Sequence, residues 1–274
     1  MHTRVAAISA FCLGLCLAAA PARAQYAARG ASDPATGETY HVELGGYIWN
    51  PTPELAITSE SLGIVGSRID FVTDLGIQKA RFKQIKLVLR PSKKTKFRFE
   101  YTPITYSALA SPRVEIIFNG HKYPISIPVQ TDLEWKAYRF GYEYDFVYTD
   151  RGFFGLLLEA KYTKIQASLK NIIDTEFVEA KAPIPAIGAI GRVYVAPNIS
   201  ITAELSGFPG GVISSIDEQS DGHFFDFDLY GTVNFTDHYG AQAGYRSFDV
   251  FYKVDTDQGE MKLKGLYFGG VVRF

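Results

Sequence analysis

Apolar and polar residues alternate with a period of two along most of the chain. Since successive side chains of a β-strand point to opposite faces of the sheet, this period predicts strands with one apolar and one polar face. The segment 137–148, AYRFGYEYDFVY, is the most regular, because six aromatic residues share the face opposite Arg139, Glu143 and Asp145. Ten such segments are found, at 39–49, 82–90, 96–104, 137–148, 153–163, 189–196, 199–207, 224–235, 241–248 and 265–274.

The connections between these segments alternate in length. The short ones read PSKKT, TDRG, PN and TDH, and the long ones lie near 50–81, 103–131, 168–185, 208–222 and 253–262. Short turns at one end of a meander and long extracellular loops at the other are typical of outer-membrane barrels. We therefore predict an all-β fold, a closed antiparallel up-and-down transmembrane β-barrel of about ten strands, with eight or twelve as alternatives. The runs RVEIIF and KYPISIPV around Asn119 and Gly120 predict a hairpin above the membrane.

The polar faces of the expected strands carry both signs of charge in equal number. Eight are basic and eight acidic, namely Glu43, Lys86, Arg90, Arg98, Glu100, Arg139, Glu143, Asp145, Glu159, Lys161, Arg192, Glu204, Asp226, Asp228, Arg246 and Arg273. Ten strands enclose an interior only modestly wider than that of eight strands, which side chains fill. The sequence therefore predicts a network of paired charges that fills the lumen. A functional alternative is a narrow polar pore whose selectivity these charges set.

The first residues have the features of a secretory signal peptide, expected at 1–24. An apolar run from Val5 to Ala20 follows His2 and Arg4, and a small-residue A-x-A site ends at Ala24. Both cysteines of the sequence lie inside this segment, so the exported chain is expected to have no disulfide. Residues 25–38, rich in Ala, Gly and Pro, are expected to form a flexible periplasmic lead-in, and 39–274 the barrel.

Composition narrows the class of protein further. Without the two arginines of the expected signal peptide, 26 of the 28 basic residues remain against 29 acidic ones, a net charge of about −3, so nucleic acid is not an expected partner. Apolar residues make up 47% and aromatic residues 14% of the chain, too many for a disordered protein. No run of 18 or more apolar residues follows the expected signal peptide, so strands rather than helices are expected to cross the bilayer.

In hydrocarbon an unpaired backbone polar group costs several kcal/mol, so a membrane-spanning sheet must close on itself. The segment 265–274 is therefore expected to pair with 39–49. With its signal peptide, alternating aromatic strands and terminal Phe274, the chain resembles the small outer-membrane β-barrel proteins of bacteria. That resemblance implies that Phe268, Val272 and Phe274 form a signal read by the barrel assembly machinery, although Val272 replaces the usual penultimate aromatic residue. The soluble alternative is a periplasmic β-sandwich or lipocalin-like barrel.

Three kinds of function stay open at this level. We expect a structural or surface-binding protein, in contact with outer-membrane lipid and lipopolysaccharide; a narrow pore is the alternative. An enzyme is less expected. His223 lies near Asp226 and Asp228, but the spacing does not match the acid pairs of omptin proteases, and no histidine starts the His-x-Ser motif of lipid A deacylases.

No cofactor or metal site is expected. The acidic stretch 217–228 is expected to be a solvated loop, with a cation-mediated contact to lipopolysaccharide as an alternative, and its spacing matches no calcium loop. Asp70 and Asp74 lie in a segment of the first long loop that could close over the barrel mouth. The sequence leaves the ligand, the family and the oligomeric state open.

Overall fold

The structure, a computed structural model, describes residues 35–58, 67–118, 121–125, 127–170, 175–208, 220–254 and 257–274. The expected signal peptide and residues 25–34 of the expected lead-in lie outside this part of the chain, so both stay predictions. The described residues all fall within one compact unit, residues 34–274. None of them forms a helix long and apolar enough to cross a membrane.

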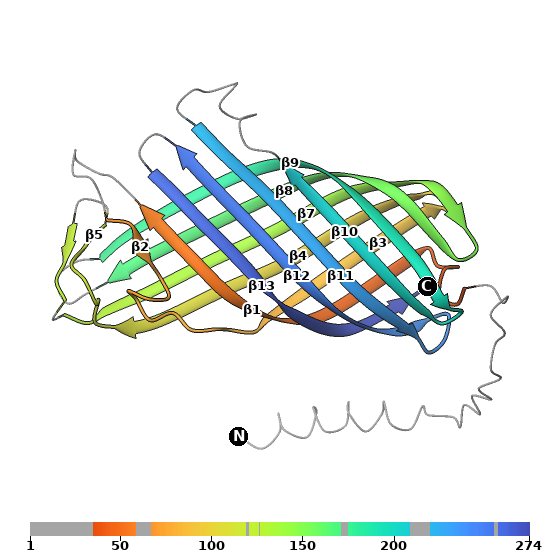
Figure 1. Ribbon diagram of the computed structural model, residues 1–274, viewed down its shortest axis with the longest axis horizontal. Coiled ribbons are helices and arrows are strands. Elements are labelled where there is room, and N and C mark those ends of the chain that lie inside the picture. The colour runs from red at the N-terminus through yellow and green to blue at the C-terminus, as the bar shows by residue number, and fades with distance from the viewer. Residues whose placement is uncertain are drawn as a thin grey trace, which may run out of the picture. The chain divides into compact units, whose positions relative to one another are not determined.

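Ten of the described strands form one closed antiparallel sheet (Figure 1). Each strand pairs with its neighbours in chain order, and the last pairs with the first. They are β1 (Val42–Thr58), β3 (Phe82–Ser92), β4 (Thr95–Ala110), β7 (Val129–Thr149), β8 (Gly152–Lys170), β9 (Thr175–Ala196), β10 (Ile199–Phe208), β11 (Ser220–Asn234), β12 (Tyr239–Val254) and β13 (Asp257–Arg273). The predicted up-and-down barrel of about ten strands is confirmed.

The seam between the first and last strands runs along almost their whole length. In the register of β1 against β13, Glu43 stands opposite Arg273 and Ile48 opposite Phe268. The backbone of Phe274 extends the seam, since its N–H donates to the Val42 carbonyl at 2.9 Å and its carbonyl accepts from the His41 N–H at 2.7 Å. The predicted pairing of 39–49 with 265–274 is confirmed, because the barrel leaves no open edge there.

The connections at one end of the barrel, here called the turn end, agree with the sequence. Short turns join β3 to β4, β7 to β8, β9 to β10 and β11 to β12. At the opposite end, here called the loop end, two expected long loops are wrong. β8 runs to Lys170 and β9 begins at Thr175, and β12 runs to Val254 before β13 begins at Asp257. Most residues of the expected loops 168–185 and 253–262 therefore lie in strands.

The other three expected loops are shortened or kept. The loop 50–81 begins later, because β1 continues to Thr58, and it contains the short strand β2 (Ile69–Asp70), which pairs with β1. The loop 103–131 is reduced from both sides, because β4 continues to Ala110 and β7 begins at Val129. The loop 208–222 starts at the end of β10 as expected, but β11 begins at Ser220; residues 209–219 lie outside the described residues. The expected solvated loop 217–228 is wrong over 220–228, because β11 runs through these residues and buries Asp226 and Asp228 inside the barrel.

The strands are long because the alternation of inward and outward residues continues past the apolar outer wall. Toward the loop end the outward residues become polar and the inward residues become apolar. On β7 near the turn end, Phe140 points outward and is 52% exposed, while Glu143 is buried inside. Toward the loop end of the same strand, Glu134 points outward while Leu133 and Trp135 are buried inside. β8, with 19 residues, spans about 48 Å at a tilt of about 40°, against an apolar band of about 25 Å in such barrels. The loop-end half therefore extends beyond the bilayer.

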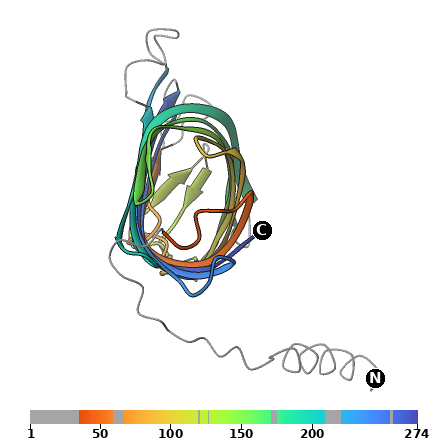
Figure 2. The same cartoon turned by 90° about the vertical axis from the view of Figure 1, so that its right-hand side faces the viewer.

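The interior of the loop-end half is an apolar core. Its buried side chains include Trp49, Ile104, Tyr106, Leu133, Trp135, Phe248 and Leu263. The expected hairpin of β5 (Ile116–Phe118) and β6 (His121–Tyr123) is confirmed, and it lies in the loop-end half, which extends beyond the bilayer. Ile116, Phe118 and Tyr123 are buried in the core, so the hairpin lies across the interior of the ring (Figure 2).

The segment of the first loop that contains Asp70 and Asp74 also covers the loop end. Asp74 is held by its own turn, since its N–H donates to the Asp70 carbonyl at 2.8 Å and its carboxylate accepts from the Asp70 N–H at 2.9 Å. Phe71, Leu75 and Ile77 from this segment are buried in the apolar core. The segment therefore closes the mouth together with the hairpin.

Candidate functional site

The interior of the turn-end half is filled by charged side chains, and every one of the ten barrel strands supplies at least one. All sixteen residues expected there lie inside, and all are buried except Arg98, whose side chain is 12% exposed. This set is called the lumen charge network below. Alternation alone is enough to place these residues, because each has the opposite parity to an aromatic or aliphatic residue that faces outward.

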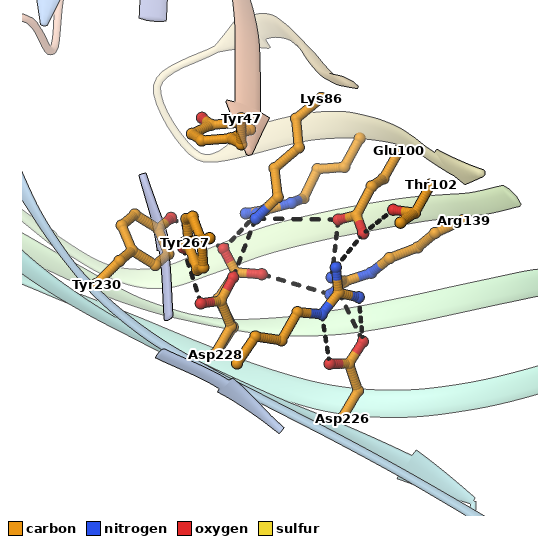
Figure 3. Close-up of polar contacts among 12 residues, drawn as sticks. Tyr47, Lys86, Glu100, Thr102, Arg139, Asp226, Asp228, Tyr230 and Tyr267 are labelled. Atoms are coloured by element: carbon orange, nitrogen blue, oxygen red, sulfur yellow. Dashed lines mark hydrogen bonds and ion pairs between the residues drawn. The ribbon is translucent and has the colours of Figure 1, made fainter. Parts of the chain in front are cut away.

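Arg246 is a central residue of the network, and its partners Asp226 and Glu100 are labelled in Figure 3. Its guanidinium donates to both carboxylate oxygens of Asp226, at 3.0 and 2.7 Å, and also to Glu100 on β4. Arg139 donates to Glu159 on the neighbouring strand and lies 3.4 Å from Glu204. Because β12 and β4 are not neighbours in the sheet, the contact between Arg246 and Glu100 crosses the lumen and joins opposite walls.

Lys96 belongs to the network although it was not among the expected residues. Its ammonium donates to Asp145 at 2.8 Å and also to Glu143, which in turn accepts from Arg98 at 2.6 Å. Lys96 is 2% exposed. The expected strand 96–104 begins at Lys96, and Lys96 alternates in step with Arg98, so the same alternation places it inside the barrel.

Tyrosine hydroxyls complete the network on the β1, β11 and β13 side of the lumen. Tyr267 donates to Asp228 at 2.8 Å and Tyr230 donates to Glu204 at 2.9 Å. The ammonium of Lys86 lies 3.0 Å from the second oxygen of Asp228. It is 5.5 Å from the ring centroid of Tyr230 and 5.6 Å from that of Tyr267. The sequence signal for these tyrosines is again parity, but tyrosines also occupy the lipid-facing side of other strands.

A segment of the expected lead-in fills the turn end of the lumen, so the expectation that 35–38 is flexible is wrong. Glu38 accepts from Arg192 at 2.7 Å and from the Tyr194 hydroxyl at 2.7 Å, and lies 3.4 Å from Arg90. Burial alone would raise the pKa of Glu38, but Arg192 and Tyr194 outweigh it and lower the pKa to about 2. The segment crosses the opening of the ring in Figure 2 and is fixed there by a charged carboxylate.

The charge network meets the apolar core at a small cavity. A cavity of about 30 Å³ lies at this boundary, lined on one side by Trp49 and Trp135 and on the other by Arg139 and Asp226. A cavity of this size holds one or two water molecules. Three layers therefore fill the described part of the lumen: the segment 35–38 at the turn end, the charge network in the middle and the apolar core at the loop end.

The residues considered for catalysis do not form a site. Asp226 and Asp228 are inside the barrel and ion-paired to Arg246 and Lys86, whereas His223 is on the outer face, 3.8 Å from Asp249. The barrel wall thus separates the histidine from the two aspartates, as alternation implies. Among the described residues, no group of three or more His, Cys, Asp or Glu side chains could hold a metal ion.

The residues expected to form an assembly signal lie at the seam. Phe268 and Phe274 point outward and are 62% and 70% exposed, and Val272 has the same parity between them. Their recognition by the assembly machinery stays a prediction. In the closed barrel these side chains form part of the apolar outer wall.

No protein-family model matches the chain, and no curated protein is similar to it in sequence. A solved structure does match the whole barrel. The outer membrane protease OmpT of Escherichia coli superposes with a TM-score of 0.57 over 89% of this chain and 100% of that chain, at 6% identity. The chain has the fold of a bacterial outer-membrane barrel. At this identity the likeness shows the fold alone.

Two further solved structures match with lower scores. Ail, the attachment invasion locus protein of Yersinia pestis, has a TM-score of 0.38 at 11% identity, over 85% of this chain and 99% of that chain. The toluene transporter TodX of Pseudomonas putida has a TM-score of 0.35 at 9% identity, over 89% of this chain and 92% of that chain. The match to OmpT confirms the class-level resemblance to bacterial outer-membrane barrels, and no single family is assigned.

Proposed function

We propose that this chain is an integral outer-membrane protein whose sealed barrel has a structural or surface-binding role. The outer wall of the turn-end half supports the membrane placement, because its large apolar side chains, such as Phe140, Leu158 and Phe268, are 52–62% exposed. Exposed apolar patches of this extent are rare on soluble monomers. The turn end then faces the periplasm and the loop end the cell exterior, as in other barrels with short periplasmic turns.

The filling of the lumen by buried ion pairs is the observation that carries the functional part of the proposal. A pore for small solutes needs a continuous water path, but salt bridges such as Arg246 to Glu100 join opposite walls of this lumen. Opening a path requires several buried charges to lose their partners, each at a cost of about 3–5 kcal/mol. The narrow-pore alternative is therefore less favoured than a closed barrel.

The loop-end half supports a role at the cell surface. It has polar outward residues such as Asp132 and Glu134, an apolar interior, and a mouth closed by the β5–β6 hairpin. A polar outer wall around an apolar interior suits a part of the barrel that lies in water and contacts lipid headgroups or another molecule. A hydrolase role is not part of the proposal, since His223 and Asp226 lie on opposite sides of the wall.

Conductance of the refolded protein in planar bilayers tests the sealed lumen. We expect silent bilayers at neutral pH with the complete exported chain. Discrete conductance steps would contradict a closed lumen and favour the pore.

Labelling of intact cells tests the placement and orientation independently. We expect Ser107→Cys, at the loop end, to react with a membrane-impermeant maleimide, and Thr149→Cys, at the turn end, to react only after the cells are opened. Both side chains are exposed in the barrel itself. Equal labelling of the two variants in intact cells would overturn the proposed orientation.

A further inference from the structure

The segment 35–38 crosses the turn-end mouth of the barrel without being a strand of its sheet (Figure 2). The backbone N–H of Thr36 donates to the Pro197 carbonyl at 2.7 Å. The backbone N–H of Gly37 donates to the Asp237 carboxylate at 3.0 Å. These bonds run to the connections between strands, so release of the segment leaves the pairing of the ten barrel strands intact.

The groups that hold the Glu38 carboxylate are fixed by contacts of their own. The Arg192 guanidinium also donates to the Thr202 hydroxyl at 2.9 Å. The Arg90 guanidinium also donates to the Tyr148 hydroxyl at 2.8 Å. Both guanidiniums therefore stay in position when the carboxylate leaves. A site whose donors are already ordered loses little conformational entropy when it binds a ligand.

Glu38 also balances the charge of the interior. Lys96 and Glu38 join the sixteen expected charged residues, which makes nine cations and nine acids in the described part of the lumen. Among the described residues, Glu38 is the one acid that forms an ion pair with Arg90 or Arg192. Both arginines are buried, and a buried charge without a partner is strongly destabilising. The mouth without Glu38 would therefore favour the binding of another anion.

The donors around Glu38 fit a planar group with two oxygens. Its Oε1 accepts from Arg192 and from the Tyr194 hydroxyl, both at 2.7 Å, and its Oε2 lies 3.4 Å from Arg90. A guanidinium matches the geometry of a carboxylate better than a point charge does. The chemistry of the pocket is thus that of a carboxylate site.

We propose that the turn-end mouth is a carboxylate-binding pocket that the chain fills with its own Glu38. The segment 35–38, called the latch below, is then an autoinhibitory contact, which a carboxylate from another molecule displaces by taking the place of Glu38. This goes beyond the structural or surface-binding role. It rests on the proposed orientation only for the compartment, the periplasm, that supplies the competing carboxylate.

Rescue of Glu38→Ala by formate tests the pocket in the refolded, full-length exported chain. A ligand that binds only the folded protein stabilises it. We therefore expect formate to restore about half or more of the urea midpoint lost in this variant, with saturation, while sodium chloride at the same concentration does not. The matched control is Glu54→Ala, which removes an acid 3.5 Å from the exposed Lys264 on the outer wall. Equal responses of the two variants to formate, or no response in either, overturn the pocket.

Inorganic phosphate tests the class of ligand. We expect formate to restore the midpoint of Glu38→Ala at a lower concentration than phosphate does, because the donors are arranged around a planar group. Rescue by phosphate at the lower concentration overturns the carboxylate assignment.

Amide exchange in the unsubstituted protein tests the latch without a variant. The N–H groups of Thr36 and Gly37 exchange when the latch is open, and a ligand of the open pocket multiplies that population by one plus its concentration over its dissociation constant. Formate at ten times the dissociation constant found with Glu38→Ala is thus expected to speed their exchange about tenfold. The N–H of Val42, which donates to Phe274 at the seam, should not change.

Exchange of Thr36 and Gly37 that formate and chloride speed equally would show that no carboxylate displaces the latch. These measurements do not depend on the orientation of the barrel in a cell or on its conductance. Their failure is therefore distinct from a failure of the labelling or the bilayer experiment.

Discussion

Removal of the Arg246 guanidinium is the sharpest perturbation of the lumen charge network. Arg246→Met keeps much of the side-chain length and removes three hydrogen bonds, two to Asp226 and one to Glu100. Both carboxylates are buried, at 3% and 6% exposure. The substitution therefore leaves two buried acids with fewer cations, in a part of the barrel that bulk water does not reach.

The size of the destabilisation depends on the ion pairs that Asp226 and Glu100 keep in the variant. Asp226 keeps Lys161 at 3.0 Å, and Glu100 keeps Arg139 at 3.5 Å and Lys86 at 3.9 Å. Neither carboxylate loses every partner, so we expect a loss near the lower end of the cost of breaking a buried ion pair, about 3 kcal/mol. Adding Asp226→Asn restores the charge balance, and we expect the double variant to recover about half of the loss.

Equilibrium unfolding in urea, with the protein refolded into lipid vesicles and followed by tryptophan fluorescence, measures these free energies. The matched control is Arg68→Met, which removes an ion pair of 2.8 Å with Glu260 whose side chains are 60% and 52% exposed. An exposed pair contributes about 0–1 kcal/mol. If Arg246→Met costs no more than Arg68→Met, the network does not stabilise the barrel, and the reasoning that closes the lumen with it is refuted.

Three further predictions concern the other layers and the wall. Glu38→Gln should release the segment 35–38, seen as faster amide exchange of these residues. The pKa of Glu38 in the folded protein, about 2, lies below its usual 4.5. The stabilisation that the charged Glu38 contributes should therefore be complete above pH 4.5 and lost as the pH falls toward 2. Amide exchange of 35–38 that does not depend on pH in this window would contradict this role of Glu38. Trp135→Ala, in the apolar core, should cost about 3–5 kcal/mol in urea unfolding, and a cost under about 1 kcal/mol would show that the loop-end half is not packed. Leu158→Arg, on the lipid-facing wall, should cost about 2–4 kcal/mol in vesicles and Ser168→Arg, outward on the same strand near the loop end, about 0–1 kcal/mol; equal costs would place both residues at one depth.

Much of the barrel could be predicted from the sequence, because the alternation of polar and apolar residues within each strand is a local and periodic signal. The parity of residues such as Arg139 and Glu143 against Phe140 determines which side of the wall each one faces, and the closure of β1 on β13 follows from the absence of water in the bilayer. The same parity places the charged residues inside. It does not say which acid pairs with which base, since contacts such as Arg246 to Glu100 cross between strands that are not neighbours.

The errors in the ends of the strands have a common physical cause. Expected strands were ended where the apolar outer face ended, for example at Trp49, although the alternation continues to Thr58 with the faces exchanged. The position of the β5–β6 hairpin and the role of Glu38 depend on long-range contacts. Nothing in the segment around Glu38 distinguishes a flexible lead-in from a plug until Arg192 and Arg90 are known to point at it.

The exchange of polarity along each strand also fixes how deep the barrel sits in the bilayer. Moving the barrel by one outward position, two residues along a strand, would bring Lys136 into hydrocarbon or raise Tyr138 into water. A lysine on the lipid face costs up to about 2–4 kcal/mol at the bilayer midplane and about 0–1 kcal/mol near the interface, and the cost recurs on every strand that carries a charge at that level. Depth is thus determined to within about one row. The level at which the outer wall changes from apolar to polar is therefore fixed by the sequence of each strand.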